Sequence, residues 1–171
     1  MGCCQIITQQ AEHATYDRVL ILGYTAIGAH AYLDGKLVAA DRGPPDLTQR
    51  DYWTTDRSLY RGTFHWNDVP PDVLAYDDSL LVDVPYMLLT QCLTAGIVSA
   101  DAGRIEVPVY ICLGERDCSP NPHAEPSYYG RSPYVTLHIL PRSGHCQTFA
   151  GSRNEMIERI DRWIRSIDPA G

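Results

Sequence analysis

The sequence predicts an α/β fold in which three parallel strands are flanked by helices. Three short apolar runs, at residues 18–23, 107–113 and 135–140, are each typical of a strand that is buried on both faces. Helical or mixed segments separate these runs, and such spacing favours right-handed crossovers and a parallel sheet. With 44% hydrophobic and 20% charged residues in a chain of 171, the composition is that of one ordinary globular domain.

The first two elements follow from the positions of apolar side chains. Residues 3–14 predict a helix, because apolar side chains recur on one face, namely Cys3, Ile7, Ala11 and Ala14. The run RVLILG at 18–23 then predicts the first strand.

The middle third of the chain has a different amino-acid composition. Residues 42–72 are rich in proline, glycine and aromatic side chains, and two Pro-Pro pairs interrupt them. Short helical stretches are predicted near 72–82 and 86–98. We therefore expect this middle third to form an irregular insertion with aromatic content, and not a linker.

Regular structure is predicted to return in the last third. The runs VPVYICL and VTLHIL predict the second and third strands, and the prolines between them predict a loop with one short helix. Ser152 and Glu155 have the spacing of a capping box at the start of the terminal helix. Its apolar stripe comprises Met156, Ile157, Ile160, Trp163, Ile164 and Ile167.

Composition excludes several functional classes. A formal net charge of −7 disfavours binding to a phosphate backbone, so no nucleic-acid partner is expected. The sequence contains no apolar run long enough to span a membrane and no secretory signal, so we expect a cytoplasmic protein without a membrane partner. Its six cysteines show no C-x-x-C spacing, so no structural zinc site is expected.

An acid and a histidine follow two neighbouring predicted strands. Asp117 closely follows the second strand, and His145 follows the third. Carboxyl ends of parallel strands meet at one edge of a sheet, which is where chemistry is usually placed. A carboxylate that accepts from one imidazole nitrogen fixes the tautomer and frees the other nitrogen as a general base. We therefore predict Asp117 and His145 as catalytic residues.

The plainer alternative is that Asp117 caps a turn and His145 ends a strand. For each residue considered alone, this structural role is commoner than a catalytic one. The joint placement of the two residues at strand ends, before a capped amphipathic helix, favours catalysis. Structural or solvated roles are expected for the remaining histidines, which are His13, His30, His65, His123 and His138.

The segments that carry these residues resemble a known family. VPVYICLGERD, LHILPRSGH and the terminal helix together resemble the C-terminal part of α/β-hydrolases, with Asp117 matching the family's acid and His145 its base. The segment FHWNDVPPDVLAYDDSL is similar to the lid insertion of some members. This resemblance implies a single, partial α/β-hydrolase domain over residues 1–171, with 42–100 as its lid-like insertion.

One family motif is missing from the sequence. The nucleophile of α/β-hydrolases lies on a G-x-S-x-G elbow, and no such pentapeptide occurs here. Residues 23–28 come nearest, but they carry Thr25 and their second glycine is one position late. No upstream His-Gly segment is present to supply the oxyanion hole. In the family, the elbow serine is often followed by Met-Gly, a helix and a strand like RVLILGY. Met1-Gly2 would then follow the nucleophile directly, and we expect the chain to be a shortened copy.

Two functions from different classes follow from this comparison. The first is a hydrolase of carboxylic esters or amides whose serine lies upstream, so that this chain alone is inactive. In the intact form, His145 would deprotonate the serine and Asp117 would orient His145. A small apolar ester-like or amide-like substrate is expected under five aromatic side chains, which are Tyr52, Trp53, Tyr60, Phe64 and Trp66. The resemblance implies neither a metal nor an organic cofactor.

The second function is a non-catalytic remnant or interaction module that pairs with another chain. The strand at 18–23 would then expose an edge suited to self-association. A third possibility is a nucleophile within the chain, and Cys118, Cys146, Ser119 and Ser143 all lie beside the predicted site. Sequence neighbours point apart on an extended segment, so neither cysteine is expected to serve His145, and the sequence defines no geometry that would place either serine for it. A Cys118–Cys146 disulfide stays open at this point.

Overall fold

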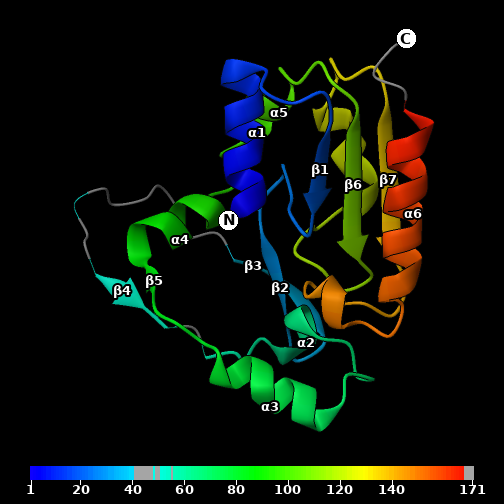
Figure 1. The fold of residues 1–171 in the computed structure, drawn as a ribbon. Coiled ribbons are helices and arrows are strands. Elements are labelled where there is room, and N and C mark those ends of the chain that lie inside the picture. Colours follow the sequence, from blue (N-terminus) through cyan, green and yellow to red (C-terminus); the bar gives the residue numbers. More distant parts are fainter. Residues whose placement is uncertain (41–47, 49–50, 55, 168–171) are drawn as a thin grey trace.

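A three-stranded parallel sheet forms the centre of the molecule. The computed structural model describes residues 1–40, 48, 51–54 and 56–167. The strands are β1 (Val19–Leu22), β6 (Val109–Gly114) and β7 (Val135–Leu140), in the order β1-β6-β7 (Figure 1). Both pairs of strands are parallel, and Ile111 of β6 stands opposite Ile21 and Leu137. The predicted mixed fold with three parallel strands is therefore confirmed.

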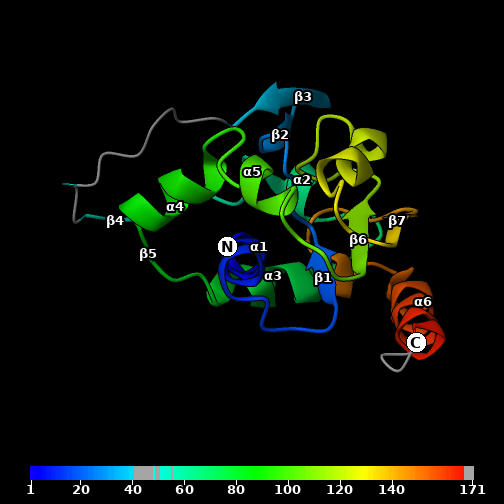
Figure 2. The ribbon, with the colours of Figure 1, turned by 90° about the horizontal axis from the view of Figure 1, so that it is seen from above.

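Helices cover both faces of this sheet. The helix α1 (Gly2–His13) lies on one face together with α5 (Ser99–Ala102), and α6 (Arg153–Ser166) lies on the other (Figures 1 and 2). Successive side chains of β6 pack alternately against the two helical layers, because successive residues of a strand point to opposite faces of the sheet. Ile111 packs with the α1 layer, whereas Tyr110 packs with the α6 layer.

The terminal helix begins where the sequence predicts, but without the predicted capping box. The Ser152 hydroxyl donates to the carbonyl oxygen of Pro141, 2.6 Å away, and the Glu155 carboxylate accepts from Arg159. Both side chains thus have partners outside the helix start. In the predicted apolar stripe, Met156 and Trp163 are buried. Each is followed by an exposed isoleucine, since Ile157 is 56% exposed and Ile164 is 41% exposed. One residue is about 100° of helical turn, which rotates them away from the sheet.

The middle of the chain contains more regular structure than its sequence predicts. One hairpin was not predicted from the sequence. It consists of β2 (His30–Leu33) and β3 (Lys36–Ala39), which are joined by Asp34 and Gly35 with positive φ values of 49° and 75°. Asp-Gly is a strong hairpin signal, since both central residues of a type I′ turn need that conformation. A second antiparallel pair unites two short strands, β4 (Tyr52–Trp53) and β5 (Val84–Pro85).

Helices complete this region, the segment between the last two strands and the loop after β7. The two predicted helical stretches are found as α3 and α4. The elements are α2 (Arg61–Phe64), α3 (Pro71–Ser79), α4 (Tyr86–Leu93) and the 3₁₀ helices η1 (Pro122–Tyr128) and η2 (Gln147–Phe149). Within the described part of the chain, no helix combines the length and the apolar character needed to cross a membrane.

The α6 layer buries a histidine whose ionisation opposes folding. The ring of His138 is 6% exposed, and the Tyr110 hydroxyl lies 3.0 Å from its Nδ1. Burial lowers the pKa of His138, Arg159 lowers it further, and Glu155 opposes this change only in part. The unfolded chain therefore binds a proton that the folded chain does not, so stability is full above the unfolded pKa and falls as the pH drops below it.

We expect the free energy of unfolding in urea to decrease between about pH 7.5 and about pH 5.5. His138→Gln removes this titration and should flatten the dependence. His13→Gln, on an exposed ring, controls for the loss of one histidine. An equally steep dependence in His138→Gln would assign it to other groups.

Candidate active site

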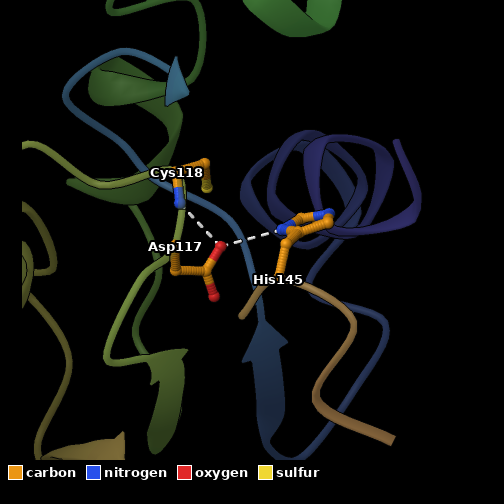
Figure 3. A group of neighbouring side chains, drawn as sticks. All are labelled: Asp117, Cys118 and His145. Atoms are coloured by element: carbon orange, nitrogen blue, oxygen red, sulfur yellow. Dashed lines mark hydrogen bonds and ion pairs between the residues drawn. The ribbon is translucent and has the colours of Figure 1, made fainter. Parts of the chain in front are cut away.

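Asp117 is held rigidly at the carboxyl end of β6. Its carboxylate is buried, and hydrogen bonds reach both of its oxygens. Oδ2 accepts from the Gly114 amide at 2.8 Å and from Gln147 Nε2 at 3.1 Å. Oδ1 accepts from the Cys118 amide at 2.7 Å and from His145 at 2.8 Å (Figure 3). The turn after β6 thus fixes both the position and the direction of the carboxylate.

His145 comes from the loop after β7 and meets Asp117 at the same end of the sheet. Its Nδ1 lies 2.8 Å from Asp117 Oδ1, so the ring donates from Nδ1 to the carboxylate. The other ring nitrogen points away from Asp117 (Figure 3). Its side chain is 37% exposed, its backbone amide donates to Thr63, and its ring stacks edge-on against Phe64. The predicted contact between the two residues is therefore confirmed.

The carboxylate of Asp117 is ionised in this setting. Burial raises its pKa, but hydrogen bonding and the charge of His145, together with the two backbone amides, outweigh this effect, and the pKa lies below its ordinary value. A carboxylate in this state holds the Nδ1 proton on the ring. Nε2 is then the nitrogen that carries a lone pair, as a general base requires.

A buried carboxylate behind the site ties two of its loops together. Glu125, on η1, accepts hydrogen bonds from the Thr25 hydroxyl, the Ser119 hydroxyl and the Ala26 amide. Thr25 and Ala26 follow β1, and Ser119 follows the catalytic candidate Asp117. Sequence reasoning missed Glu125, because nothing in its proline-rich surroundings distinguishes it from an exposed acid.

Replacing Glu125 with leucine should destabilise the protein by about 2 kcal/mol, because three buried donors lose their acceptor. Urea unfolding measures the change. Glu106→Leu is the matched control, since Glu106 is 61% exposed and its ion pair with Arg131 lies at the surface. Equal losses in both variants would show that the buried network contributes nothing specific.

An apolar cavity of about 150 Å³ lies beside the histidine. His145 and Cys118 form part of its wall, and α4 contributes two leucines, Leu89 and Leu93. Of the aromatic side chains predicted to cover a pocket, Trp53, Tyr60 and Phe64 line this cavity. The other two do not. Tyr52 is 67% exposed, and Trp66 lies 3.9 Å from the Arg116 guanidinium, which stacks on its ring.

Cys118 lies beside the site, as predicted, but its side chain does not point away from His145. Its sulfur, a carboxylate oxygen of Asp117 and a ring nitrogen of His145 all lie within 4.8 Å of one another, so the expectation that neighbouring side chains point apart is wrong here. The Cys118 backbone amide donates a hydrogen bond to the Asp117 carboxylate, and this contact turns the Cys118 side chain back toward the site (Figure 3). Burial, followed by the charge of Asp117, raises the pKa of this thiol, which donates to the Gly23 carbonyl. A protonated, buried thiol is a poor nucleophile.

These three side chains are also the group of potential metal ligands found in the described residues. Carboxylate, thiolate and imidazole together suit a divalent ion such as Zn²⁺. Each of the three side chains also has partners within the protein, since both oxygens of Asp117 accept hydrogen bonds, one of them from His145, and the Cys118 thiol donates to the Gly23 carbonyl.

The other nucleophile candidates are engaged elsewhere. The Ser143 hydroxyl donates to Gly144, and the Ser119 and Thr25 hydroxyls donate to Glu125. Burial raises the pKa of Cys146 to about 11. All six cysteines are free thiols, so the Cys118–Cys146 disulfide is not formed.

Comparison with protein-family models gives no match, and comparison with curated proteins gives none either.

Proposed function

We propose that Asp117 and His145 are the acid and base of a hydrolase that cleaves small apolar carboxylic esters or amides. The observation that carries this proposal is the 2.8 Å hydrogen bond from the imidazole to a buried, ionised carboxylate, at the carboxyl ends of adjacent parallel strands. A neighbouring apolar cavity supplies the place for an acyl or leaving group. The resemblance to α/β-hydrolases leads to the same chemistry.

The serine nucleophile would come from a segment preceding Met1. The start of α1 lies at the end of the sheet where β1 finishes (Figure 1), and the Cys3 thiol donates to the Leu22 carbonyl at 3.3 Å. A residue just before this helix would therefore stand near the carboxyl ends of the strands. The positive end of the helix dipole would also favour the oxyanion that forms there.

In the proposed reaction, His145 Nε2 takes the proton of the serine hydroxyl as its oxygen adds to the substrate carbonyl carbon. Asp117 keeps the ring in its tautomer and stabilises the imidazolium. His145 then returns the proton to the leaving alcohol or amine. A water molecule, deprotonated by the same nitrogen, hydrolyses the acyl-enzyme and releases the acid.

The test compares the printed chain with a version extended upstream through its reading frame. We expect hydrolysis of short p-nitrophenyl esters by the extended protein only. A fluorophosphonate should label the upstream serine, and its replacement by alanine should abolish both signals. A folded extended protein that neither turns over esters nor reacts with the probe would refute the proposal.

The edge position of β1 favours a second candidate, association with another chain. Among the described strands β1 pairs only with β6, and its last residue, Leu22, is 38% exposed. An unpaired strand edge readily accepts a further strand. Self-association through residues 18–23 would make the sedimentation coefficient depend on concentration, and Leu22→Lys should reduce this dependence. A monomer at all concentrations would exclude this candidate.

A further inference from the structure

Three side chains with metal-binding atoms converge at the carboxyl end of the sheet (Figure 3). Asp117 and Cys118 come from the turn after β6, and His145 comes from the loop after β7. A carboxylate oxygen, the sulfur and a ring nitrogen of this group all lie within 4.8 Å of one another. Ligand atoms of a tetrahedral zinc site stand roughly 3–4 Å apart. The three atoms therefore need only small movements to surround one ion.

We propose that Asp117, Cys118 and His145 bind a zinc ion, and that this ion blocks the general base of the site. The donor atoms indicate the metal, because thiolate and imidazole favour Zn²⁺ over Mg²⁺ and Ca²⁺, which take oxygen ligands. Binding of the ion is independent of the proposed hydrolase activity, whereas the inhibition rests on that activity.

The Asp117 carboxylate is already oriented for this role. Its Oδ1 accepts from the Cys118 amide at 2.7 Å and from His145 at 2.8 Å. Its Oδ2 accepts from Gly114 and Gln147. The ion would replace only the hydrogen bond from His145, and the other three would continue to orient the carboxylate, as hydrogen bonds to metal ligands commonly do. The separation of Oδ1 and His145 Nδ1 has to widen from 2.8 Å to about 3.3 Å, which the partly exposed ring allows.

The surroundings of the Cys118 sulfur favour a cation. Burial raises the pKa of this thiol, and the negative charges of Asp117 and Glu125 raise it further. The same two charges attract a divalent ion, and coordination to a metal removes the proton of a thiol. That proton leaves to solvent, and the sulfur gives up its 3.4 Å hydrogen bond to the Gly23 carbonyl, in which an S–H group is a weak donor. A thiolate and a carboxylate then balance the two charges of the ion.

The bound ion would face the apolar cavity. His145 and Cys118 both line this cavity of about 150 Å³, so an ion held between them is reached from it. A water molecule from the cavity would fill the fourth position, and zinc sites with three protein ligands and one open position are common in enzymes. The cavity therefore provides both an entry path and room for the fourth ligand.

A bound ion prevents His145 from acting as a base. A neutral imidazole has one proton and one nitrogen lone pair, and the metal takes the lone pair. If Nδ1 binds the ion, the proton moves to Nε2. If Nε2 binds the ion, that nitrogen is itself occupied. In both cases Nε2 has no lone pair for a serine hydroxyl, so zinc binding and proton transfer exclude each other.

The first test titrates Co²⁺, a coloured substitute for Zn²⁺, into the metal-free chain of 171 residues. We expect one ion per chain, visible bands with the intensity of four-coordinate cobalt, and a near-ultraviolet charge-transfer band from a thiolate ligand. Zn²⁺ should displace the cobalt and abolish both signals. Cys118→Ser should lose the charge-transfer band and bind Zn²⁺ at least about 100-fold more weakly, because even the loss of a hydrogen bond to a ligand costs about 10- to 100-fold.

Cys146→Ser is the matched control, because Cys146 is half-buried and adjoins His145 but does not belong to the group of three ligands. This variant should keep the charge-transfer band and the wild-type affinity. A wild-type chain that binds no Co²⁺, or binds it without a thiolate band, would overturn the proposal. So would a Cys118→Ser variant with wild-type affinity for Zn²⁺.

The second test measures inhibition in the upstream-extended protein. Saturating Zn²⁺ should lower ester hydrolysis and fluorophosphonate labelling about 100-fold or more, the contribution of a general base, and EDTA should restore both. In Cys118→Ser, the same Zn²⁺ concentration should leave the ratio of the rates with and without zinc near one. Full activity with one zinc ion bound would refute the inhibition. An extended protein without any ester activity would refute the hydrolase and the inhibition together, whereas the cobalt spectra decide the metal site by themselves.

Discussion

Replacing Asp117 with asparagine is expected to lower kcat of the upstream-extended protein toward p-nitrophenyl esters by about 10⁴-fold. The asparagine amide cannot stabilise an imidazolium, and its NH₂ group facing Nδ1 would favour the wrong tautomer. His145→Ala removes the base itself and should reduce kcat at least as strongly. Because the two residues act as one unit, the double variant should be little worse than His145→Ala. Steady-state kinetics on the three variants measure these effects.

A second histidine–aspartate pair in the same chain provides a matched control. His65 Nε2 lies 3.0 Å from Asp77 Oδ2, and neither of these two residues lines the apolar cavity, although His65 directly follows Phe64 of its wall. Asp77→Asn should leave kcat of the folded protein unchanged, although it breaks a buried pair. Equal losses of kcat in Asp77→Asn and Asp117→Asn would indicate a general loss of structure and contradict the assigned roles.

Substituting Gly114 with alanine should destabilise the protein by about 3 kcal/mol or more. A Cβ atom on Gly114 would lie 2.4 Å from the carbonyl oxygen of Gly144 and 2.7 Å from that of Ser143. Gly144 is itself confined, since a Cβ there would lie 2.7 Å from the carbonyl oxygens of Thr63 and Phe64. Backbone atoms therefore surround both positions, and no side chain can rotate away to make room.

The same substitution should also disturb the site. The Gly114 amide donates to Asp117, and the loop that it presses against carries His145. Equilibrium unfolding in urea measures the loss of stability, and ester hydrolysis by the extended protein reports the site. Gly130→Ala is the control, because an added Cβ there meets no atom within 4 Å, so a change of no more than about 0.5 kcal/mol is expected. If Gly114→Ala is as stable as this control, the close contact is not as described.

Local patterns were sufficient to predict the sheet and the two residues at its edge. An apolar run long enough for one buried strand identifies β1, β6 and β7. The rule that chemistry lies at the carboxyl ends of parallel strands then selects Asp117 and His145. The Asp34-Gly35 hairpin carries an equally local turn signal, but its strands lack a long apolar run, since β2 is mostly half-buried and β3 is exposed.

Features formed by distant residues required the tertiary structure. Glu125 reaches Thr25, 100 residues away, only because η1 returns to the loop after β1. Ser152 and Glu155 have capping-box spacing, yet nearby groups outside the helix start compete for their side chains. Cys118 turns toward His145 because its amide binds Asp117, which strand periodicity does not describe.

The sequence by itself determined that the chain forms an α/β sheet with an acid and a histidine at neighbouring strand ends, because apolar periodicity and parallel connection fix which ends meet. Tertiary structure decided what surrounds that pair, namely the cavity wall supplied by α4 and the tight approach of Gly114 to Gly144. These contacts depend on the paths of long connections, which burial and steric fit select together and no short pattern encodes.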